Sequence, residues 1–183
     1  MYMVDRQVLE AFASGFCAEN GLHLAVSWEM PTGYETAYGT YDIVENTLFL
    51  NWALLEKLPQ GQQLFYLCHE LRHGMQYQQP EQFSPFLRES LPYVLLYDGT
   101  CFRLQDGVWK QGKLEGEEAY FTNAYLGFPY EMDANQFAYE QVCLRCGASE
   151  ALERLLTRSS PEKIMTEEEY RQLFRRIDEK LAT

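Results

Sequence analysis

The segment between Pro59 and Pro80 constrains the fold more than any other part of this 183-residue chain. Its apolar residues recur at the spacing of one helical face, and the two prolines bound it, which predicts a helix over about residues 62–78. The same segment carries the sequence HELRH at residues 69–73. Residues four apart lie one turn apart on one face of a helix, so the imidazoles of His69 and His73 can reach one metal ion.

The residues of this HExxH motif have complementary roles at a zinc ion. Zinc accepts imidazole nitrogens at about 2.0–2.1 Å and then needs a third ligand and an open position. The metal lowers the pKa of a water bound at the open position toward about 7. Glu70, next to the first histidine, can reach this water and remove a proton from it. An accidental match is the alternative, but two of the chain's three histidines occupy these positions.

A second helical segment supplies the candidate third ligand. The pattern predicts a helix over residues 129–146, ended by Gly147 in the left-handed conformation. Glu131 and Asn135 are four residues apart on it, so one turn presents a carboxylate and an amide together. Glu131 completes a zinc site of two histidines and one glutamate, and Asn135 can orient a ligand histidine through a hydrogen bond. The alternative for Glu131 is an exposed acidic residue in the first turn of the helix, favoured there by the macrodipole.

Together, HELRH at residues 69–73 and the downstream pattern Glu131-x-x-Ala134-Asn135-x-Phe137-Ala138 resemble the gluzincin zinc peptidases, and most closely the ImmA/IrrE-type metallopeptidases. The resemblance covers about residues 37–146. It implies that the two histidines and Glu131 bind zinc, that Glu70 is the general base, and that the substrate is a peptide or protein. It also implies that the strand at residues 47–51 is the edge that pairs with an extended substrate. Many gluzincins carry Asp where Asn135 stands, and an amide there polarises the histidine less but keeps the hydrogen bond.

The rest of the pattern predicts an α+β protein built as a single domain over residues 1–183. We expect a helix at 4–20, strands at 22–28, 37–44 and 47–51, an insertion with β-hairpin character at 80–128, and C-terminal helices within 148–183, at about 148–158 and 166–181. The resemblance narrows this to a zincin-like minimal metallopeptidase domain, in which a small, mostly antiparallel sheet packs on the active-site helix and on the second ligand-bearing helix. Thr166 and Glu169 predict a capping box for the last helix, whose apolar face packs in the domain core or against a partner helix.

The five cysteines are too irregularly spaced to indicate a disulfide framework. Cys143 and Cys146 have the CxxC spacing of a redox or zinc motif, but they lie within an expected helix and no second CxxC completes a four-sulfur site. We therefore expect ordinary buried thiols, with a redox protein as the alternative. Cys68 falls on the apolar face of its helix, and His23 points away from the apolar side of its strand, so neither is expected to bind the metal.

Charge and hydropathy exclude several classes of partner. The formal net charge is −12, which repels phosphate backbones and anionic lipids and argues against nucleic acid and membrane partners. No stretch approaches about 18 consecutive apolar residues, and the N-terminal residues lack the basic start and apolar run of a secretory signal. We therefore expect a cytoplasmic zinc metallopeptidase that hydrolyses peptide bonds. The alternative is a non-catalytic, metallopeptidase-like regulatory or binding module.

Overall fold

The computed structural model describes residues 6–182, and the contacts within the chain divide it into two compact units. The first unit extends to Pro80 and resumes at Asp133–Thr157, whereas the second comprises Glu81–Met132 and the chain from Arg158 onward. The segment expected as an insertion, residues 80–128, therefore folds almost entirely within the second unit, together with the last helix.

A three-stranded mixed sheet forms part of the first unit. Its strands, in the spatial order β1–β3–β2, are β1 (Ala25–Ser27), β2 (Gly39–Asp42) and β3 (Thr47–Leu50). β2 runs antiparallel to β3, with Gly39 opposite Leu50, while β1 runs parallel to β3. Asn46, at φ 48°, lies in the turn between β2 and β3 in the left-handed conformation that asparagine tolerates.

The strand order corrects the expectation that residues 47–51 form a sheet edge. β3 is paired on both sides, and its Leu48 and Leu50 are completely buried. The four residues of β2 are all half-exposed. The more apolar strand β3 therefore takes the central position, and the more polar strand β2 takes the edge.

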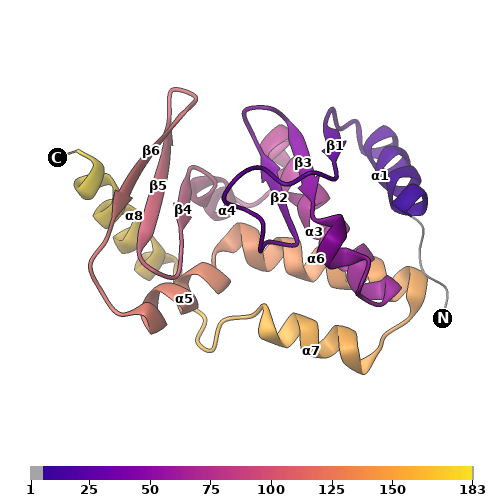
Figure 1. Ribbon diagram of the computed structural model, residues 1–183. Helices are drawn as coiled ribbons and strands as arrows, with labels where there is room; N and C mark the ends of the chain where they lie inside the picture. The colour runs from indigo at the N-terminus through magenta and orange to yellow at the C-terminus, as the bar shows by residue number, and fades with distance from the viewer. Residues whose placement is uncertain (1–5, 183) are drawn as a thin grey trace. The chain divides into compact units, whose positions relative to one another are not determined.

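The helices of the first unit position the candidate site. They are α1 (Arg6–Asn20), α2 (Trp52–Leu55), α3 (Gln60–Gln78), and most of α6 (Pro129–Cys146) and of α7 (Glu150–Arg158). α3 packs against β2, β3 and α1 (Figure 1). Its expected apolar stripe of Leu64, Cys68, Leu71 and Met75 is buried, which confirms the helical face predicted from the sequence. α6 ends as predicted, at Gly147 with φ 81°.

The second unit is built on an antiparallel meander. Its strands, in the order β4–β5–β6, are β4 (Tyr93–Leu95), β5 (Thr100–Gln105) and β6 (Val108–Lys113). Asp106 and Gly107, at φ 51° and 76°, make the tight turn between β5 and β6 that an Asp-Gly pair predicts. The chain enters this unit through the 3₁₀ helix η1 (Pro80–Gln82), and its helices are α4 (Pro85–Ser90), α5 (Glu118–Leu126) and α8 (Glu167–Leu181).

The last helix buries its apolar face inside the second unit. α8 packs on β5 and β6 (Figure 1), and its Leu173, Phe174 and Ile177 are at most 3% exposed. The Phe174 ring stacks on Tyr93 of β4, with centroids 4.3 Å apart. The predicted capping box is present, since Thr166 accepts a hydrogen bond from the Glu169 backbone and Glu169 accepts one from the Thr166 backbone. The unit's own core, not a partner helix, therefore covers this face.

The architecture is α+β with small, mostly antiparallel sheets, as the sequence predicted at this level. Across the described part of the chain, no helix has both the length and the apolar character needed to cross a membrane.

Candidate metal centre

Two imidazole rings of α3 converge on one point. His69 and His73 lie one helical turn apart, and their Nε2 atoms are 3.0 Å from each other. Two nitrogens bound tetrahedrally to one zinc ion at about 2.0–2.1 Å would lie about 3.3 Å apart. The rings therefore hold their Nε2 atoms close to the separation required by a shared ion.

The Nδ1 atom of each ring faces a side-chain amide oxygen. His69 Nδ1 lies 2.9 Å from Asn135 Oδ1, and His73 Nδ1 lies 2.8 Å from Gln76 Oε1. An amide oxygen only accepts hydrogen bonds, so in the neutral rings both Nδ1 atoms carry the proton. Both Nε2 atoms of neutral rings in this arrangement are acceptors, and they face each other at 3.0 Å. A metal ion between them would be coordinated by both Nε2 atoms, and the two amides favour the tautomer that such binding requires.

A network of polar side chains holds Gln76 in its orientation. Gln76 is completely buried, and its Nε2 donates to Asp133 Oδ2 at 2.8 Å, which leaves Oε1 facing His73. Arg72 donates to both carboxylate oxygens of Asp133, at 2.7 and 3.1 Å, and its guanidinium carbon lies 4.6 Å from the centre of the Phe137 ring. Asp133 therefore links α6 to two residues of α3 and prevents the Gln76 amide from flipping.

Glu131 adds a carboxylate to the two imidazoles. It lies in the first turn of α6, one turn before Asn135. One ligand atom from each of His69, His73 and Glu131 lies within 4.8 Å of the other two. Among residues 6–182, no other group of three or more His, Cys, Asp or Glu side chains comes together in this way. Zinc and other divalent ions can bind a set of two imidazoles and one carboxylate. This group could therefore hold a metal ion.

Glu70 lies beside the first of these histidines, between α3 and strand β2. Its side chain is buried, with only 6% of the residue exposed. The backbone of Gly39, the first residue of β2, comes so close that a Cβ atom built there would lie 2.8 Å from Glu70 Cγ. The Glu70 side chain thus has a confined place against Gly39, on the residue that follows the first candidate ligand in the chain.

The cysteines are separate from this centre. Burial raises the pKa of the Cys68 thiol to about 12, and Cys68 lies on the buried apolar stripe of α3. Cys143 is half-buried and Cys146 is exposed, which corrects the expectation that both are buried thiols. They lie in the last turn of α6, where the helix reaches the surface. His23 is exposed, as expected, and its backbone N–H donates to Gln78 Oε1.

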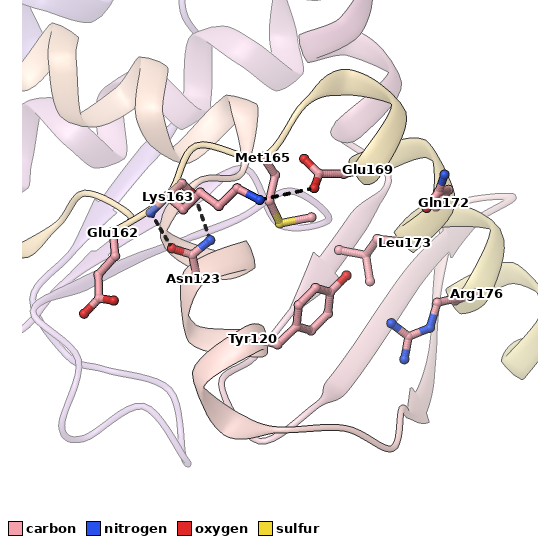
Figure 2. Close-up of a pocket in the computed structure, with 9 residues that line it drawn as sticks. All are labelled: Tyr120, Asn123, Glu162, Lys163, Met165, Glu169, Gln172, Leu173 and Arg176. Carbon is pink, nitrogen blue, oxygen red and sulfur yellow. Dashed lines mark hydrogen bonds and ion pairs between the residues drawn. The ribbon is translucent and has the colours of Figure 1, made fainter.

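The second unit contains a hollow of about 420 Å³ that is unrelated to the predicted site residues (Figure 2). Residues of α5, of α8 and of the loop before α8 line it. Asn123 fixes that loop, since its side chain donates to the backbone oxygen of Lys163 and accepts from the Lys163 backbone N–H. The lining combines the cations Lys163 and Arg176 with the acids Glu162 and Glu169. This balance of charges favours no single class of ligand.

Comparisons of the chain with models of protein families, with curated proteins and with solved structures find no match. The resemblance to the ImmA/IrrE-type metallopeptidases therefore rests on the two motifs, and the functional assignment rests on the chemistry of the His69, His73 and Glu131 group.

Replacing Gln76 with leucine is expected to weaken zinc binding by about 10- to 100-fold, the usual effect of losing a hydrogen-bond partner of a ligand histidine. Leucine has a similar size but leaves His73 Nδ1–H without the amide oxygen. The affinity is measured by competition with a chromophoric chelator. The control is Gln78→Leu on the same helix, because Gln78 contacts His23 and Tyr41 instead. Equal zinc affinity in the two variants would show that Gln76 does not support a ligand.

Proposed function

We propose that this chain is a zinc-dependent hydrolase of peptide bonds. The observation that carries the proposal is the convergence of ligand atoms from His69, His73 and Glu131, together with Glu70, which follows His69 in the chain. Zinc is proposed over other divalent ions because its protein sites commonly combine two histidines with one carboxylate and keep an open position. The HExxH motif and the Glu-x-x-Ala-Asn motif both support zinc-dependent hydrolysis of peptide bonds.

The chain's own groups have distinct roles in this reaction. When bound, the metal ion supplies a Lewis acid that polarises the scissile carbonyl and lowers the pKa of a water. Glu70 accepts a proton from the attacking water and later delivers it to the leaving amine. Asn135 and Gln76 hold the imidazoles of His69 and His73 in the ligating tautomer. Asp133 and Arg72 keep Gln76 in place.

The proposed substrate is an extended peptide or protein segment. In the described part of the chain, β2 pairs with β3 alone, so β2 is an edge strand. An extended chain can add to such an edge through backbone hydrogen bonds. The first residue of β2, Gly39, touches the Glu70 side chain, so a segment bound there would pass close to the general base. We therefore propose that β2 pairs with the substrate, the role that the resemblance implied for residues 47–51.

Removal of metal is expected to abolish hydrolysis. The purified protein is incubated with a mixture of unstructured peptides, and cleavage is followed by mass spectrometry before chelation, after chelation with 1,10-phenanthroline, and after addition of zinc. Cleavage that stops on chelation and returns with zinc supports the proposal. Cleavage that continues in metal-free protein contradicts it. Metal binding without any cleavage would favour a non-catalytic binding or regulatory module.

A further inference from the structure

We propose that Gly39 is a positioning residue for Glu70, because the missing side chain at position 39 creates the space that the Glu70 carboxylate occupies. The inference rests on the proposed function, in which Glu70 is the general base. It adds a residue on strand β2 to a site otherwise built from α3 and α6.

The backbone at position 39 does not itself require glycine. In the described residues, the glycines with a left-handed φ are at positions 21, 33, 99, 107 and 147, and Gly39 is not among them. Gly39 lies in a regular antiparallel pairing with Leu50, which any residue can adopt. Glycine inside a strand costs stability and often marks a bulge, a tight bend or a close approach of another group. The approaching group at position 39 is Glu70.

Three atoms of one side chain lie very close to the place where a Cβ would stand at position 39. An ideal Cβ there would lie 2.8 Å from Glu70 Cγ, 3.1 Å from Oε1 and 3.2 Å from Cδ. The closest of these is in the middle of the side chain, not at its flexible end, so a small rotation of the carboxylate does not relieve the overlap. Any side chain at position 39 must therefore move Glu70 or move the strand.

Strand β2 is held against α3 on both sides of Gly39, so the strand is the part that resists movement. Tyr38 stacks on Tyr66 with ring centroids 4.3 Å apart and planes at 15°. Tyr41 stacks on Tyr77 with centroids 6.1 Å apart and planes at 30°. These two aromatic pairs fix the strand before and after Gly39. A methyl group at position 39 is therefore expected to displace the Glu70 side chain.

The first test is kinetic. Gly39→Ala is expected to lower kcat by about 100-fold, the effect of misplacing a catalytic group by about 1 Å, while zinc content stays at the wild-type value because no ligand is altered. The control is Gly15→Ala in α1, where a Cβ meets no atom within 4 Å. Wild-type kcat in Gly39→Ala, alongside measurable wild-type hydrolysis, would overturn the inference and leave the proposed function standing.

The second test does not depend on activity. The melting temperature is measured for the wild type, Gly39→Ala, Glu70→Ala and the double variant. In the wild-type background, Gly39→Ala is expected to lower the melting temperature by several degrees. Glu70→Ala removes the three atoms that crowd the new methyl group. In the Glu70→Ala background, Gly39→Ala is therefore expected to leave the melting temperature unchanged. An equal loss in both backgrounds would overturn the inference. If Gly39→Ala alone does not fold, recovery of folding in the double variant gives the same support.

The two tests distinguish a failure of the proposed function from a failure of the proposed role of Gly39. A wild-type protein that binds zinc but cleaves no peptide would defeat the proposed function, and the stability cycle would still decide whether Gly39 determines the position of Glu70.

Discussion

Replacing Glu70 with glutamine is expected to lower kcat for the proposed peptide hydrolysis by about 10²- to 10⁴-fold, the usual contribution of a general base, and to leave the affinity for zinc unchanged. Glutamine has nearly the same shape as glutamate, so it fits the confined space beside Gly39. Its amide cannot accept the proton of the attacking water at neutral pH. The three candidate ligands are unchanged, so only the proton transfer is removed.

Two measurements on the same sample check this prediction: kcat on an identified peptide substrate, and zinc content by elemental analysis. Glu140→Gln is the matched control, because Glu140 is an exposed residue of α6 and should tolerate the same exchange. Unchanged kcat in Glu70→Gln would show that another group is the base. Loss of zinc in Glu70→Gln would show that Glu70 takes part in metal binding.

The second large effect is the loss of the metal on substitution of a single ligand. His69→Ala and Glu131→Ala are each expected to weaken zinc binding by more than the roughly 100-fold that an outer hydrogen-bond partner contributes. Each substitution leaves two protein ligands where three are required. Zinc should also raise the melting temperature of the wild type and have little effect on these variants, because a ligand stabilises only the state that binds it.

The chain provides controls for both substitutions. His23→Ala removes the one remaining histidine, which is exposed, and Glu140→Ala removes an acid from the same helix as Glu131. Both controls should keep wild-type zinc content, measured after gel filtration in metal-free buffer. Full zinc content in both ligand variants would mean that the metal binds elsewhere.

The sequence predicted the elements that local signals define. Proline and glycine boundaries gave the bounds of α6 and placed α3 within two residues, and the spacing along each helix indicated that His69 and His73, and likewise Glu131 and Asn135, share a face. The Asp-Gly pair at 106–107 gave the turn between β5 and β6. These features depend on residues close together in the chain, so periodicity and turn chemistry are sufficient to find them.

Features that depend on distant residues could not be predicted in this way. Alternation of apolar residues identifies a strand but does not give its neighbours. It therefore could not test the edge position that the resemblance implied for β3, which is central. The hydrogen bond between Gln76 and Asp133 joins residues 57 positions apart. Its one local signal is that Gln76 follows His73 by three residues on the same helical face. The contact between Gly39 and Glu70 leaves no local signal, because many strand glycines mark other kinds of approach.

The most direct test of the account is anomalous X-ray scattering from crystals of the zinc-loaded protein, with data collected on both sides of the zinc absorption edge. We expect one strong peak per chain, at about 2.0–2.1 Å from the Nε2 atoms of His69 and His73 and from a carboxylate oxygen of Glu131. A peak bound by other residues, or no peak beside the two imidazoles in zinc-saturated crystals, would contradict it.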